Sequence, residues 1–366
     1  MRDVHQPYHS RLFAIPASHL ESLRRFEWHS LSSLGSRMYP AMEELIKDKK
    51  ERVCQSGFVA APALSSLYIH HPSRQDFVGG LRALPLANGW RGLTELYFNG
   101  WDPYGASEIF SVLVLCASTL RFLDVSMRPP EPSQDPLPAH IPKIAFPNLQ
   151  HLSITETAGG MGYPPHLHWY MEAMQTPSLA SLKFETSCDP IEGPSSLLAF
   201  LKANQGNLTK LANVLFEYNF LSPEDLAAVL NILGGPGMGV SSLVMQAADV
   251  VYRDMGGPFP YAIFWDSVLE KFNPGPDRPA LFTKLRHFAC EQWKYGEFGP
   301  EDLLEFVKYR VGASSSEHGL ASLEMVEVTF VCEETIDVEE ELKASTGVSA
   351  VQFDLVYGEE QRWGNI

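Results

Sequence analysis

Two pairs of histidines are the residues of this sequence best suited to hold a metal ion. His166 and His168 alternate in the segment HLHWY, and His70 and His71 are adjacent. Every second side chain of a strand points to the same side, so this spacing suits a strand better than a helix. A zinc site also needs further ligands, and no HExxH motif or suitably spaced carboxylate follows. We therefore interpret both pairs as loop histidines and expect no metal site.

A glycine-rich stretch, GGPGMG at residues 234–239, has the composition of a phosphate-binding loop. A Walker loop requires lysine followed by serine or threonine, whereas Val240 and Ser241 follow here. A dinucleotide-binding loop leads from a strand into a helix, and this stretch has the opposite order. We interpret it as a helix C-cap followed by a turn, and we expect no cofactor.

The sequence contains no recognisable catalytic nucleophile. No GxSxG motif occurs, and the five cysteines are odd in number, far apart and without a CxxC pair; they are Cys54, Cys116, Cys188, Cys290 and Cys332. This pattern predicts reduced thiols in an intracellular protein, cytoplasmic or nuclear. We expect a protein that is not an enzyme; the alternative is a hydrolase-like enzyme with its site in residues 249–279 or near His166.

A six-residue phrase recurs along the chain, with apolar residues at its first, fourth and sixth positions. Clear copies are LTELYF, LRFLDV, LQHLSI and LASLKF, and the copies begin at residues 23, 64, 93, 120, 149, 179, 211, 240, 285, 320 and 348. The central copies are about 29 residues apart, at the top of the range for leucine-rich repeats. A frame beginning at residue 208 is a poorer alternative to the copy at residue 211.

Helix-like segments lie between the phrases. Residues 106–118 and 195–203 have apolar residues at helical spacing. Ser222 is followed by proline and two acids, and Gly299 begins the same pattern, which is typical of a helix N-terminus. We also predict helices at 37–55 and 260–272, and an acidic solvated segment at 333–341.

The alternation of strand phrase and helix predicts an α/β fold. We expect an irregular leucine-rich-repeat solenoid, with a parallel sheet on its concave face and helices on its convex face. An ordinary α/β sheet is the alternative. The predicted organisation is an N-terminal cap or extension at residues 1–22, about eleven repeat units at 23–357 and a C-terminal tail at 358–366.

Strand side chains alternate, so the third, fifth and seventh phrase positions are expected to point away from the helices. These positions carry aromatic and hydrogen-bonding groups, which are common in protein-binding hot spots. The candidate protein-binding residues are Tyr68, His70, Glu95, Tyr97, Asn99, Phe122, Asp124, His151 and Lys183. The alternative is that loops partly fill this face and that these residues only support the structure.

The charge of the chain restricts its partners. Its formal net charge is −16, and an acidic surface repels phosphate backbones, so we expect no nucleic-acid partner. No apolar stretch is long enough to cross a membrane and no secretory signal is recognisable, so we expect no membrane association. An unknown protein partner is the remaining expectation.

Several segments resemble the repeat region of fungal F-box proteins, especially those of mushroom-forming fungi. They are FPNLQHLSI, TPSLASLKFE and FTKLRHFACE, with the helix openings SPEDL and GPEDLLEFVKYR, and the resemblance covers roughly residues 20–355. It implies a protein–protein interaction scaffold that recognises substrates for a cullin-type ubiquitin ligase. In that family an F-box docks a Skp-type adaptor. Because the first phrase begins at Leu23, no complete F-box precedes it, and an adaptor is expected only if an F-box is missing from this chain. A truncated remnant without a partner is the other alternative.

Overall fold

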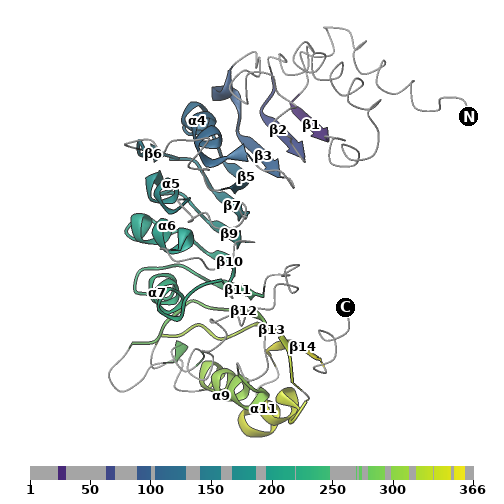
Figure 1. Ribbon diagram of the computed structural model, residues 1–366. Coiled ribbons are helices and arrows are strands. Elements are labelled where there is room, and N and C mark those ends of the chain that lie inside the picture. Colours follow the sequence, from purple (N-terminus) through teal and green to yellow (C-terminus); the bar gives the residue numbers. More distant parts are fainter. Residues whose placement is uncertain are drawn as a thin grey trace, which may run out of the picture. The chain divides into compact units, whose positions relative to one another are not determined.

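The computed structural model describes residues 24–29, 63–70, 89–99, 104–128, 141–157, 167–186, 195–218, 220–247, 269, 272–273, 279–292, 298–312, 319–332, 334–347 and 350–358. The chain divides into two compact units, Met1–Thr176 and Pro177–Ile366. Each unit is an α/β arrangement of parallel strands and helices (Figure 1). The predicted helix at residues 37–55 lies outside the described residues.

The first unit contains a parallel sheet of phrase strands. In order across the sheet they are β1 (Arg25–His29), β2 (Ser66–His70), β3 (Glu95–Asn99), β5 (Phe122–Arg128) and β7 (His151–Glu156), with β4 (Tyr104–Gly105) beside β5. The short strands β6 (Ile144–Ala145) and β8 (Met174–Gln175) form a separate parallel pair. The helical elements are η3 (Trp90–Gly92), α4 (Ala106–Cys116) and α5 (Leu167–Ala173).

The second unit continues the same pattern of elements. Its strands, in order, are β9 (Ser181–Thr186), β10 (Asn213–Glu217), β11 (Ser242–Gln246), β12 (His287–Glu291), β13 (Met325–Phe330) and β14 (Gln352–Tyr357), all paired in parallel. Its longer helices are α6 (Ser196–Asn204), α7 (Pro223–Leu233), α9 (Pro300–Val311) and α11 (Val338–Thr346). The sheet formed by the described strands of this unit is open.

The apolar positions of the phrase form the core between strands and helices. In the LTELYF copy, Leu93, Leu96 and Phe98 are each at most 1% exposed. The helices lie on this face of the strands in each unit (Figure 1). Each phrase also meets its neighbour at the same backbone position: the Thr94 amide donates to the Ser65 carbonyl at 2.8 Å, and the Arg121 amide donates to Thr94 at 2.8 Å. The regular phrase therefore keeps neighbouring strands in one register.

The predicted frames of the last two phrases were wrong. Met325 pairs with His287, the third residue of its phrase, so the β13 phrase begins at Leu323 and not at Leu320. Gln352 pairs in turn with Met325, so the last phrase begins at Ala350 and not at Val348. Several frames of this stretch place apolar residues suitably, and only the strand pairing distinguishes them. The frame at Leu211 is confirmed, because β10 begins at Asn213.

The predicted helix beginnings are confirmed where the structure describes them. The Ser195 hydroxyl accepts from the Leu198 amide at 3.3 Å, and the Ser222 hydroxyl accepts from the Asp225 amide at 3.1 Å. Gly299 has no side chain to cap α9, and the Asp302 carboxylate instead accepts from its amide at 2.8 Å.

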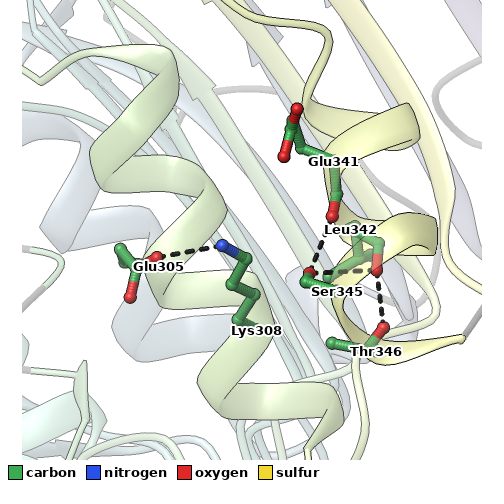
Figure 2. Close-up of polar contacts among 6 residues, drawn as sticks. All are labelled: Glu305, Lys308, Glu341, Leu342, Ser345 and Thr346. Carbon is green, nitrogen blue, oxygen red and sulfur yellow. Dashed lines mark hydrogen bonds and ion pairs between the residues drawn. The ribbon is translucent and has the colours of Figure 1, made fainter.

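We had expected the acidic segment 333–341 to be a solvated connection, but its second half begins a helix. Asp337 caps α11, and the helix extends to Thr346 because Val338 and Leu342 are buried. Helices α9 and α11 contact each other (Figure 2). Lys308 pairs with Glu305 at 3.2 Å within α9, and in α11 the hydroxyls of Ser345 and Thr346 donate to backbone carbonyls of the preceding turn.

Within the described ranges, no helix combines the length and the apolar composition that a membrane span needs.

Candidate protein-binding face

The open face of the first unit is the side of its strands that points away from the helices. It carries the third, fifth and seventh residues of each phrase, because alternate side chains of a strand point to opposite sides. Tyr68, Glu95, Tyr97 and Phe122 on this face are partly exposed, and His151 is exposed. The parallel strands pair in register, with Tyr68 opposite Tyr97. The sequence thus correctly predicted that these residues share one face.

An aromatic row crosses four adjacent strands of this face. It consists of Tyr68, Tyr97, Phe122 and His151. The ring centroids of Tyr68 and Tyr97 are 5.2 Å apart, those of Tyr97 and Phe122 are 5.9 Å apart with planes at 5°, and those of Phe122 and His151 are 6.1 Å apart. Tyr97 stacks on Phe122 although its register partner is Asp124, so the row steps diagonally between β3 and β5.

Polar groups border the aromatic row. The Tyr68 hydroxyl donates to a Glu95 carboxylate oxygen at 2.9 Å. At the carboxyl ends of the strands, the Ser126 hydroxyl donates to the Asn99 side-chain oxygen at 2.7 Å. These bonds fix the orientation of Tyr68, Glu95 and Asn99, which are partly exposed, so this part of the face is ordered before any ligand arrives.

Both tyrosines of the row are neutral at physiological pH. Burial, followed by the hydrogen bond and the charge of Asp124, raises the pKa of Tyr97 to about 12. Burial and the contact with Glu95 also raise the pKa of Tyr68. The two phenols therefore present rings and hydroxyl groups but no negative charge.

Arg25 lies at the β1 end of the row. Its guanidinium carbon is 4.0 Å from the centroid of the Tyr68 ring, and its Nη2 is 3.2 Å from a carboxylate oxygen of Glu27. Neither Arg25 nor Glu27 was among the sequence candidates, since the phrase LRRFEW is a weak copy. Arg25 and Glu27 are the third and fifth residues of this phrase, the positions from which the other candidates were chosen.

Two of the candidates, Asp124 and His70, are not members of the aromatic row. Asp124 lies on the open face but is only 7% exposed, and the neighbouring Ser126 is 3% exposed. Asp124 therefore supports the row from beneath, with only a small part of its side chain reaching the surface. His70 pairs in register with Asn99 through its backbone, and its side chain lies outside what the structure describes.

Lys183 belongs to the second unit and is described there. It lies on the open face of β9, where its ammonium group is 2.8 Å from a Glu185 carboxylate oxygen. The same face carries Glu217, which accepts from the Thr186 amide at 2.5 Å. Burial first, and then the charges of Glu185 and Glu291, raise the pKa of Glu217 to about 7 against the lowering effects of the Thr186 bond and of Lys183. Glu217 was not among the sequence candidates, because its burial depends on neighbouring strands.

His168 lies in helix α5 and is buried, so its interpretation as a loop histidine was wrong. His166 and His71 lie outside the described ranges, as do most of residues 249–279. Leu269 and Phe272 of that segment are described, and both are buried.

The described residues contain no group of three or more His, Cys, Asp or Glu side chains placed to hold a metal. Gly234 ends helix α7, as the glycine-rich stretch predicts.

No protein-family model matches this chain, and no curated protein matches it in sequence. Aromatic side chains such as those of the row are enriched where proteins bind other proteins.

Proposed function

We propose that this chain is a leucine-rich-repeat-like solenoid that binds another protein through the open face of its strands. The proposal is supported by the recurring phrase, by its parallel pairing in one register within each unit, and by helices on the opposite side of the strands. Repeated strand–helix units of this kind stack to bury apolar faces that they cannot bury alone.

The aromatic row is the observation that carries the binding role. Its four rings lie in contact across β2, β3, β5 and β7 on a face that the described helices leave open. Large aromatic side chains lose little conformational entropy on binding, particularly when they are already stacked. The row therefore supplies contact area that is in place before the partner arrives.

We further propose that the bound protein is a substrate of an F-box-type ubiquitin ligase. This part rests on the resemblance of the phrases and helix openings to fungal F-box repeat regions. The aromatic row would then hold the substrate while a separate F-box holds the adaptor.

The binding role predicts that the aromatic row decides which protein is captured. The tagged chain and a Tyr97→Ala/Phe122→Ala variant are used to capture proteins from the organism that encodes the chain, with quantification by mass spectrometry. We expect the variant to capture the specific partner at least about tenfold less, which is the effect of losing a hot spot.

The matched control is Val114→Ala/Trp169→Ala, which removes exposed apolar surface from α4 and α5 on the helix side of the same unit. It should leave capture unchanged, and circular dichroism should show that all variants are folded. Equal capture by the wild type and the aromatic-row variant would reject this face as the binding site.

The ligase role is tested separately. Fusing an F-box to the chain should cause ubiquitylation of the captured protein in the presence of a Skp-type adaptor and its ligase. If the fusion binds both partners and ubiquitylation does not increase, the ligase part of the proposal is wrong while the binding role remains.

A further inference from the structure

We propose that the Tyr68 end of the aromatic row receives an arginine side chain of the bound protein, in the place that Arg25 of this chain occupies. This inference rests on the proposed protein-binding function and names the chemistry of its partner: a segment that carries an arginine.

The first support is the position of Arg25. Its guanidinium lies over the Tyr68 ring at 4.0 Å and beside Glu27 at 3.2 Å, yet its side chain remains 60% exposed. A guanidinium that stacks on a ring keeps its N–H groups free to bind carboxylates. The face therefore already holds, from within the chain, the group that we propose it takes from a partner.

The second support is the charge around Tyr68. Glu27 of β1 is its register partner on one side, and Glu95 of β3 accepts its hydroxyl on the other. Arg25 supplies one positive charge beside Glu27, and Asp124 adds a third acid near Tyr97. With Arg128 at the end of β5, the described strands of this unit place three acids and two arginines on the open face. This face is thus net negative, which complements a basic segment.

The third support is that the Arg25 contact is easy to exchange. Both members of the Arg25–Glu27 pair are substantially exposed, at 60% and 39% of their side chains. Exposed ion pairs contribute little to stability. An incoming arginine can therefore displace Arg25 and gain both the Tyr68 ring and the Glu27 carboxylate.

The experiment compares labelled peptides that differ in one chemical feature. Each is a nine-residue Ser-Gly peptide with three identical residues at alternate positions, namely arginine, lysine or citrulline. Fluorescence anisotropy measures their affinity for the full chain at constant ionic strength. We expect arginine to bind about threefold or more tightly than lysine, because the planar guanidinium stacks better on tyrosine, and citrulline, which is neutral, to bind about tenfold or more weakly.

Variants locate the binding place. Arg25→Ala should tighten binding of the arginine peptide about threefold, because it vacates the Tyr68 ring. Tyr68→Leu should reduce the affinity for arginine to that for lysine, whereas Tyr68→Phe keeps the ring and should retain the preference. Glu27→Gln should weaken binding about fivefold. Glu172→Gln removes the same charge from an exposed position on α5 and should have a much smaller effect.

Equal affinity for the arginine and lysine peptides would overturn the inference, since it would indicate general attraction to an acidic chain. Unchanged or weaker binding by Arg25→Ala would also overturn it. A partner whose capture depends on Tyr97 and Phe122, without any preference for arginine peptides, would leave the protein-binding function intact and reject only the arginine site.

Discussion

Arg310 is fully buried in helix α9 and binds three backbone carbonyls. Its guanidinium donates to Phe272 at 2.6 Å, Leu281 at 2.7 Å and Phe282 at 2.9 Å. Phe282 has a φ of 54°, in the left-handed region that non-glycine residues rarely adopt. Burial lowers the pKa of Arg310 to about 10, so the group stays protonated at neutral pH. It joins α9 to the two segments that precede and follow residues 274–278.

We predict that Arg310→Met destabilises the protein by roughly 3 kcal/mol, because buried carbonyls lose their donors. Arg310→Lys should also destabilise it, since one ammonium group cannot reproduce the planar fork of donors. Urea unfolding measures both effects. Arg286→Met is the matched control, because Arg286 is exposed and ion-paired to Glu324, and it should change stability by less than about 0.5 kcal/mol. Similar losses for the Met variants at positions 286 and 310 would contradict this role.

Glu217 gives the second unit a pH-dependent stability. Its pKa is about 7 in the folded protein, above the value of about 4.3 expected in an unfolded chain. Between these values the folded state binds more protons, so this group lowers the free energy of unfolding as pH rises from about 4.5 to 7. Glu217→Gln should therefore be more stable than the wild type at pH 8 and equal to it below pH 4. Urea unfolding across this range tests the sign, and an advantage of the variant that grows toward acid pH would refute it.

Among the elements, helix α7 has the clearest local signal. Ser222 caps it, Pro223 is its first residue, and Glu224 and Asp225 lie in its first turn. Each feature favours a helix N-terminus independently of the rest of the chain. For this reason the sequence located its beginning to the residue.

We predict that Ser222→Ala lowers the free energy of unfolding by about 1 kcal/mol, through loss of the bond from the Asp225 amide. Ser222→Thr keeps a hydroxyl acceptor and should restore most of the stability. Thermal and urea unfolding of both variants provide the measurement. A Thr variant as unstable as the Ala variant would show that the hydroxyl does not cap the helix.

Elements whose position depends on pairing were harder to predict. The frame of β13 was wrong because the leucines at 320 and 323 both suit a phrase, and only pairing with His287 selects the second. The frame of β14 depends in turn on the pairing of Gln352 with Met325. His168 was interpreted as a loop residue, but the apolar residues Leu167, Tyr170 and Met171 around it are buried at helical spacing in α5.

At the scale of the whole molecule, the chain is acidic, with a formal net charge of −16. Each open face, taken by itself, is acidic as well. The first unit has Glu27, Glu95 and Asp124 against Arg25 and Arg128. On the second unit the acids of the open face are Glu185, Glu217, Glu291, Glu327 and Asp354, and Lys183 is the one lysine or arginine that the described strands place among them. Acidic faces steer basic partners toward them and repel nucleic acids. The overall charge and the proposed arginine-bearing partner are therefore consistent.

The sequence by itself determined most of the phrase strands, the side to which their residues point wherever the frame was right, and most helix beginnings. These features follow from the period of apolar residues and from capping chemistry, both of which act over a few neighbouring residues. Tertiary structure decided which of those residues touch each other. The diagonal stacking of Tyr97 on Phe122, the burial of Asp124 and the position of Arg25 over Tyr68 all join different strands. Such contacts depend on the side chains that neighbouring strands bring alongside, and no local pattern contains that information.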